Sequence, residues 1–226
     1  MYKAEILADS LSPQGNRLTT MKITFPRIVL AEFNTHRMFS RNSASSRAIP
    51  FKKMVQMVEE NPFIPIAWQK DHKGMQGTEY ETHKEHIELN NIEWLEARDS
   101  AINHAKILNA KGNITKQLCN RLLEPFMWHT VIISATEFSN FFKLRCPAYY
   151  DGQTTHRSRK DYRKKNDPLN GKTYSEEYFR AINESQADIH IQAIAELMWD
   201  VMNESTPKKL KAGEYHLPFI EIEEDL

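Results

Sequence analysis

Strand-like patterns occupy three stretches of this chain, and they do not alternate regularly with the helix-like patterns around them. Residues 2–10 and 17–26 alternate apolar and polar side chains on either side of the turn sequence Ser-Pro-Gln-Gly-Asn, so they predict two strands joined by a turn. Residues 127–136 are dense in β-branched residues and predict a further strand. Because strands and helices mix without strict alternation, the order favours an α+β fold over a doubly wound parallel sheet.

Several other segments carry apolar residues at helical spacing. They predict helices over 27–37, 51–62, 78–111, 115–125, 137–145 and 185–205, with Gly112 as a C-terminal cap of the third. The segment from about 147 to 178 differs, because Pro, Gly, Asp, Asn and basic residues dominate it. We expect an inserted mobile loop there, within a single domain that comprises residues 1–226.

The bulk composition excludes several classes of protein. Lys plus Arg number 30 and Asp plus Glu also number 30, whereas a general nucleic-acid coat is usually basic overall. The two cysteines, Cys119 and Cys146, are too few for a disulfide scaffold, and no four-ligand zinc pattern exists. No apolar run approaches the roughly 20 residues of a membrane helix, and the N-terminus does not resemble a signal peptide. We therefore expect a cytoplasmic protein without a metal site or a membrane partner.

The stretch from 35 to 47, THRMFSRNSASSR, concentrates cations and hydroxyls without one carboxylate. Its Arg37, Arg47 and Ser45, together with successive backbone N–H groups, could converge on an anion. Arg presents a planar fork to phosphate oxygens, and hydroxyls add short charge-assisted hydrogen bonds. The alternatives are a solvated basic loop and a strip that binds nucleic acid.

Four other features have both a functional and a structural interpretation. Cys146 is either a reactive thiolate or a packing residue. His83 and His86 have the i, i+3 spacing of two metal ligands, but without a third ligand nearby they are also typical of surface histidines. The basic run 156–165 either binds a polyanion or is a solvated loop. The tail sequence 214–219 either covers an active site or packs on the domain.

The basic stretch resembles the signature R-H-R-x-x-S-x-N-x-x-S-x-R of the flavin-dependent thymidylate synthases (ThyX). The matching residues are His36, Arg37, Ser40, Asn42, Ser45 and Arg47. Three later blocks resemble the same family in the same order. The second block has Arg121 four residues before Pro125, the third has Asn140, Leu144 and Arg145, and the fourth has Gln186 and Ile189. Together the four blocks span most of the chain.

This resemblance implies a ThyX-like fold, with a mainly antiparallel sheet flanked by helices, and a homotetramer that binds FAD. It also implies methylation of dUMP to dTMP, with methylenetetrahydrofolate as carbon donor and NADPH as reductant of the flavin. The implied cofactor-binding residues are His36, Arg37, Asn42, Asn140 and Leu144. The implied nucleotide-binding residues are Ser45, Arg47, Arg121 and Arg145, with Arg145 also catalytic because it can stabilise negative charge on the base.

Two positions inside the signature depart from the family pattern. Thr35 stands where the family has its first Arg, and Ser43 stands where it has Glu. These departures motivate an alternative, a related flavin-dependent enzyme that hydroxymethylates the pyrimidine or uses dCMP as its substrate. A second alternative, from another class, is a non-catalytic nucleic-acid-binding module that uses residues 156–165.

Overall fold

The central sheet has five strands in the order β3-β4-β2-β1-β7. In the computed structural model, which describes residues 1–73 and 79–219, all neighbouring strands pair antiparallel except β1 and β7, which are parallel. The predicted α+β class with a mainly antiparallel sheet is therefore confirmed. The strands are β1 (Lys3–Leu11), β2 (Arg17–Pro26), β3 (Ser40–Ser43), β4 (Trp128–Ala135) and β7 (Lys208–Lys209).

A tight turn joins β1 and β2, as the sequence predicts. Gly15 has a φ of +84°, a conformation that a residue with a Cβ adopts only with strain. A bulge between Ile6 and Ala8 then shifts the register of β1 by one residue. Because one extra residue reverses the alternation of side chains, Asp9 reaches the face of the sheet that α8 covers. There it accepts hydrogen bonds from Arg17 and from Ser205 at the end of α8.

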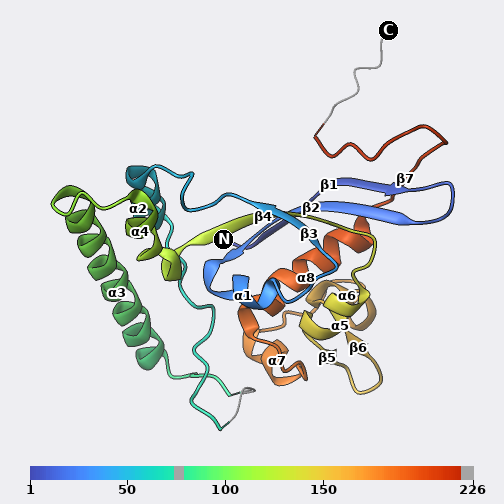
Figure 1. Ribbon diagram of the computed structural model, residues 1–226. Coiled ribbons are helices and arrows are strands. Elements are labelled where there is room, and N and C mark those ends of the chain that lie inside the picture. Colours follow the sequence, from blue (N-terminus) through green and yellow to red (C-terminus); the bar gives the residue numbers. More distant parts are fainter. Residues whose placement is uncertain (74–78, 220–226) are drawn as a thin grey trace.

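One face of the sheet is covered by α1 (Leu30–Phe33), α5 (Ser139–Arg145) and α8 (Ile189–Glu204), which lie on the same side of the strands in Figure 1. Met21 and Ile23 of β2 are fully buried against Ile191, Ile194 and other residues of α8. The main core therefore lies between α8 and the sheet. The opposite face receives the C-terminal tail, because His216 bonds to Ser10 and Thr20, which alternate with the core-facing side chains.

A helical unit stands beside the sheet (Figure 1). It consists of α2 (Phe51–Glu60), α3 (Lys84–Ala110), α4 (Lys116–Arg121) and the 3-10 turn η2 (Glu124–Phe126) around a second apolar core. The predicted helix over 78–111 begins only at Lys84, and Thr78 lies outside the described residues. Gly112 follows the end of α3, but the positive φ there belongs to Asn113, at 49°. A Cβ on Gly112 would lie 2.9 Å from the Leu108 carbonyl oxygen, so close packing explains this glycine.

The predicted helix over 27–37 is shorter in the structure. The 3-10 turn η1 (Arg27–Val29) leads into the single turn of α1, which ends at Phe33. The hydroxyl of Thr35 donates to the Glu32 carbonyl over 2.7 Å, in competition with continued helical bonding. The basic stretch is therefore free to extend and join the sheet as β3.

The expected loop over 147–178 instead contains regular structure. It forms β5 (Tyr149–Tyr150), β6 (Thr155–His156), α6 (Arg159–Asn166) and the start of α7 (Glu176–Ala181). Tyr149, Tyr162 and Phe179 make a third buried cluster, and Ser158 caps α6 by accepting from the Asp161 N–H over 2.9 Å. Aromatic residues scattered along the segment thus supply a small core, which its polar composition conceals. Its mobility stays a prediction.

Within residues 1–73 and 79–219, no helix combines the length and the apolar character needed to cross a membrane.

Candidate functional site

The middle of the signature forms an edge strand. β3 pairs with β4 through Ser40↔Ser134 and Asn42↔Ile132, and all four of its residues are exposed. Since β3 is the last strand in the sheet order, its outer backbone N–H and C=O groups are not used by the ladder. Ser40 and Asn42 point to one face and Arg41 to the other. The strand therefore offers exposed polar groups to a ligand.

The end of the signature is a turn, which the buried side-chain amide of Asn120 connects to α4 by hydrogen bonds. Asn120, which is fully buried, donates from Nδ2 to the carbonyls of Ser46, at 2.8 Å, and Ile49, at 3.1 Å. The Ser45 hydroxyl accepts from the Arg47 N–H over 3.2 Å and so shapes the turn. The tether places the segment that carries Arg47 next to the helix that carries Arg121.

Asn120 is a residue that the sequence analysis missed. Its sequence signal is weak, because Asn120 lies in a helical segment of mixed polarity, directly before Arg121.

Three arginines of the predicted site remain unpaired. Arg37, Arg47 and Arg121 are exposed, and within residues 1–73 and 79–219 none of them forms an ion pair with a carboxylate. Arg41 differs, because its Nη1 donates to the carbonyls of Asn34 and His36 at 3.0 and 3.3 Å. Arg41 therefore holds the backbone of the signature, while the other three guanidiniums are available to an anion.

Arg145 and His36 come together from two separate sequence blocks. The Nε of Arg145 donates to Nε2 of His36 over 2.9 Å, and Nη1 of Arg145 bonds to the Glu32 carboxylate. His36 is buried against Phe141 of α5, with ring centroids 4.9 Å apart. Burial lowers the pKa of His36, and the charges of Arg145 and Arg41 lower it further. The imidazole is therefore neutral, with its proton on Nδ1 and with Nε2 as the acceptor.

Glu32 is a second residue that the sequence analysis missed. Burial raises the pKa of its carboxyl, the ion pair with Arg145 opposes this, and the charge of Asp188 adds to it. Asp188 caps α8 by accepting from the His190 N–H over 2.8 Å. The sequence signal for Glu32 is weak, because a lone Glu in a predicted helix is typical of a solvated face.

The remaining cofactor candidates lie on the exposed side of α5. Asn140 and Leu144 are four residues apart and so share one face of the helix, and Leu144 is 51% exposed. Asn140 lines a hollow of about 370 Å³ together with Lys143, Arg157 and Trp199. No hydrogen bond in the described part of the chain joins Asn140 to His36 or Arg37. The structure thus presents these residues toward solvent.

The other sequence candidates have structural roles. Cys146 is buried, and its thiol donates to the Ala195 carbonyl, while burial raises its pKa well above the usual range. This confirms Cys146 as a packing residue. His86 pairs with Glu81 at 3.2 Å, and no cluster of three or more His, Cys, Asp or Glu in residues 1–73 and 79–219 is arranged to hold a metal ion. His216 joins the tail to the sheet through Ser10 and Thr20, at 2.9 and 2.8 Å.

Comparisons with known proteins give structural but not sequence matches. No protein family model and no curated protein sequence matches the chain. Among solved structures, the UMP/dUMP methylase PolB from Streptomyces cacaoi bound with 5-Br UMP matches with a TM-score of 0.59 and 13% identity, over 90% of this chain and 89% of that chain. The same enzyme bound with 5-Br dUMP matches with a TM-score of 0.54 and 14% identity, over 83% of this chain and 66%, just under two thirds, of that chain.

A thymidylate synthase X (ThyX) structure from Helicobacter pylori, with FAD and dUMP, gives a TM-score of 0.42 and 13% identity, over 81% of this chain and 66% of that chain. That score is too low to support an argument about this chain. The two PolB structures therefore establish the likeness, and the chain has a fold similar to that of a pyrimidine nucleotide methylase.

Proposed function

We propose that this protein is a flavin-dependent enzyme that methylates C5 of a pyrimidine nucleotide monophosphate, with dUMP as substrate and dTMP as product. The proposal rests on the position of the Arg145 guanidinium, which is hydrogen-bonded to His36 and Glu32. The surrounding fold is similar to that of a UMP/dUMP methylase. The residues around it have the signature order that resembles the ThyX family. The activity itself is inferred from this site, because a fold alone does not specify a reaction.

The nucleotide phosphate is assigned to the turn of the signature. Arg47 and Arg121 are exposed cations, and the Asn120 tether supports their proximity. Ser45 adds a hydroxyl to the same turn. A guanidinium binds a phosphate with two parallel hydrogen bonds, so this group of side chains suits a monophosphate.

The pyrimidine is assigned to Arg145. Its Nε and Nη1 are bonded to His36 and Glu32, and in the described residues Nη2 has no hydrogen-bond partner. Nη2 can therefore donate to a carbonyl oxygen of the base. Negative charge develops on the base during substitution at C5, and a guanidinium already fixed in position stabilises that charge without reorganising. Neutral His36 is needed for this role, because a protonated imidazole could not accept from Nε.

The flavin is assigned to Arg37, Asn42, Asn140 and Leu144, with His36 acting through Arg145. FAD combines a pyrophosphate with flat ring systems, and these residues supply an unpaired cation, polar groups on an open strand edge and an exposed apolar side chain. The donor set therefore fits the cofactor. When bound, the flavin supplies the hydride, with NADPH as its reductant and methylenetetrahydrofolate as the carbon donor. The outward position of Asn140 and Leu144 suits a site shared between subunits of a homotetramer.

UMP is a second candidate substrate, because the methylase with the similar fold is described as acting on UMP and dUMP. Hydroxymethylation and the use of dCMP remain alternatives, which Thr35 and Ser43 motivate. All of these reactions use the same phosphate and flavin sites. They differ in the sugar, in the base or in the product.

One experiment separates these reactions. The protein is incubated with FAD, NADPH, methylenetetrahydrofolate and either dUMP, UMP or dCMP, and the masses of the products are measured by mass spectrometry. Methylation adds one methylene unit, and hydroxymethylation adds one methylene unit and one oxygen. We expect dUMP to gain one methylene unit. If the protein binds no flavin and none of the nucleotides changes mass, the proposal is wrong. Tight RNA binding by a protein that is colourless because it binds no flavin would favour the nucleic-acid-binding module.

A further inference from the structure

A large cleft lies outside the signature site. Its volume is about 1020 Å³, and its walls are α6, α7 and one side of α8, together with Tyr2 and Ile66. None of the residues that resemble the ThyX signature lines it. We name it the α6–α8 cleft. All of α6 and the start of α7 belong to the segment that the sequence analysis expected to be a loop, so the cleft was not predicted.

The carboxylates of the α6–α8 cleft already have donors within the protein. Glu196 accepts from the Arg159 N–H over 2.6 Å and from the Tyr149 hydroxyl over 3.3 Å. Asp167 accepts from the backbone N–H groups of residues 171 and 172 at 3.0 and 2.9 Å. Asp200 is hydrogen-bonded to Ser158. The negative side chains of the cleft therefore have structural partners.

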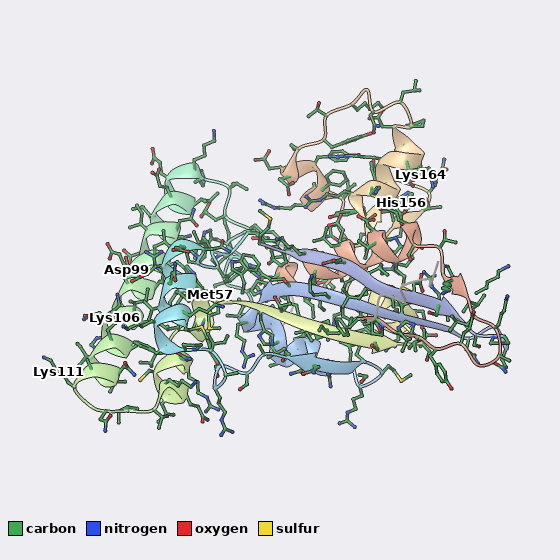
Figure 2. All side chains as sticks on the ribbon, turned by 90° about the horizontal axis from the view of Figure 1, so that it is seen from above. Met57, Asp99, Lys106, Lys111, His156 and Lys164 are labelled. Atoms are coloured by element: carbon green, nitrogen blue, oxygen red, sulfur yellow. The ribbon has the colours of Figure 1, made fainter. Side chains whose placement is uncertain are left out.

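Three cations of the cleft lack such partners. Arg159 pairs with Glu176 at 2.7 Å, and Lys160 bonds to Glu204. In contrast, Arg163, Lys164 and Arg180 form no ion pair in the part of the chain that the structure describes. Figure 2 shows Lys164 on α6, at the opposite end of the molecule from Lys111, which directly follows α3. Positive charge without a protein counterion is thus concentrated on the walls from α6 and α7.

Aromatic rings hold two of these cations in place. The guanidinium of Arg163 lies over the ring of Phe179, 5.6 Å from its centroid, and Arg180 lies over Tyr80 at 5.9 Å. Phe179 is itself only 1% exposed, so its ring is a fixed support. A guanidinium stacked through its face keeps its N–H edge free for hydrogen bonds. The two arginines are therefore ordered before any ligand binds, which reduces the entropy cost of binding an anion.

Most of the uncharged lining is apolar and suits the body of a ligand. Ile66, Ala193 and Leu197 contribute apolar surface to the cleft. Its volume is at the upper end of the range for small-molecule and cofactor sites, about 300–1,000 Å³. We propose that the α6–α8 cleft binds a phosphorylated small molecule of nucleotide size, with its phosphate groups on Arg163, Lys164 and Arg180. This site is separate from the proposed methylation site and does not depend on it.

Isothermal titration calorimetry on the full chain tests the proposal. The ligands are ADP, inorganic pyrophosphate and adenosine. The test variant is Arg163→Gln/Lys164→Gln/Arg180→Gln. The matched control is Lys52→Gln/Lys53→Gln/Lys111→Gln, which removes the same charge from the helical unit on the other side of the molecule. We expect ADP and pyrophosphate to bind and adenosine not to bind. Loss of charge-assisted hydrogen bonds should weaken ADP binding at least about tenfold in the test variant, with no change in the control.

A single charge reversal, Lys164→Glu, distinguishes a loss of binding from a folding defect, because Lys164 is exposed on α6 and its substitution should not disturb the fold. It should weaken ADP binding while circular dichroism stays that of the parent. The inference is overturned if the parent binds neither ADP nor pyrophosphate, if the test variant binds ADP as the parent does, or if only an RNA oligonucleotide binds. Arg47→Ala, which tests the proposed methylation site, should leave ADP affinity at the cleft unchanged, so the two proposals can fail separately.

Discussion

The Nε of Arg145 donates to Nε2 of His36 over 2.9 Å, which joins the last residue of α5 to a residue more than a hundred positions earlier in the chain. This bond requires a neutral imidazole. It also fixes the direction of the guanidinium, because Glu32 bonds to a second nitrogen. The pair explains why a histidine and an arginine from two separate sequence blocks belong to one site.

Arg145→Ala should reduce turnover more than nucleotide affinity. The charge that Arg145 stabilises develops during the reaction, so its loss raises the barrier and should reduce kcat about 10²–10³-fold. Steady-state kinetics with the nucleotide that the protein methylates measures this, and Lys111→Ala on the helical unit is the control. Full recovery of the parent rate at saturating nucleotide would contradict the electrostatic role of Arg145.

Arg47→Ala should mainly weaken nucleotide binding. A phosphate is held equally in the ground and transition states, so the loss should appear in KM and Kd and not in kcat. Charge-assisted hydrogen bonds contribute about 1.5–3 kcal/mol, which corresponds to roughly ten- to 150-fold in affinity. Titration with the nucleotide measures it, and Lys53→Ala on α2 is the matched charge control. An unchanged Kd would remove Arg47 from the phosphate site.

Acid should break the pair between His36 and Arg145. The pKa of His36 is lower in the folded protein than the usual value of about 6.5, so the unfolded chain binds the proton more readily. The contribution of neutral His36 to stability is therefore present above about pH 6.5 and is lost as pH falls through the folded pKa. Thermal unfolding of the parent and of His36→Gln between pH 5 and 8 measures this. The difference in Tm between the two proteins should shrink toward low pH; a constant difference would contradict the titration of His36.

Asn120→Ala should destabilise the turn of the signature as well as the whole fold. The substitution leaves the carbonyls of Ser46 and Ile49 without their donor, at a cost of about 1–3 kcal/mol. Urea unfolding measures the free energy, and nucleotide titration reports on the turn. Asn203→Ala removes a single exposed amide bond to Trp199 and is the control. If both variants lose the same stability and neither loses affinity, the tether does not order the site.

The sequence predicted β1, β2 and β4 better than the short strands, such as β3, and the helical segments near them. Alternation along β2 and the β-branched run of β4 depend on burial of one face, a strong and local signal. The early end of α1 could not be predicted, because it depends on the side-chain bond of Thr35 to the Glu32 carbonyl. The contact between Arg145 and His36 arises from tertiary packing of α5, which residue spacing alone does not specify. The aromatic cluster around Phe179 was hidden for the same reason, because its members are far apart in a polar segment.

The departures at Thr35 and Ser43 should retune the substrate or the product. Both residues are exposed. Thr35 precedes β3 and bonds to the carbonyl of Glu32, the residue that holds Arg145. Ser43 is the last residue of β3 and pairs with Val131. Serine is smaller than glutamate, is neutral, and donates as well as accepts hydrogen bonds. Replacement of the family Arg and Glu together leaves the net charge unchanged but alters shape and bonding, so we expect a roomier pocket. The double substitution Thr35→Arg/Ser43→Glu should shift the ratio of dUMP to dCMP or UMP turnover, or the mass of the product, relative to the parent. The same product from the same nucleotide at similar rates in both proteins would show that the two departures have no effect on specificity.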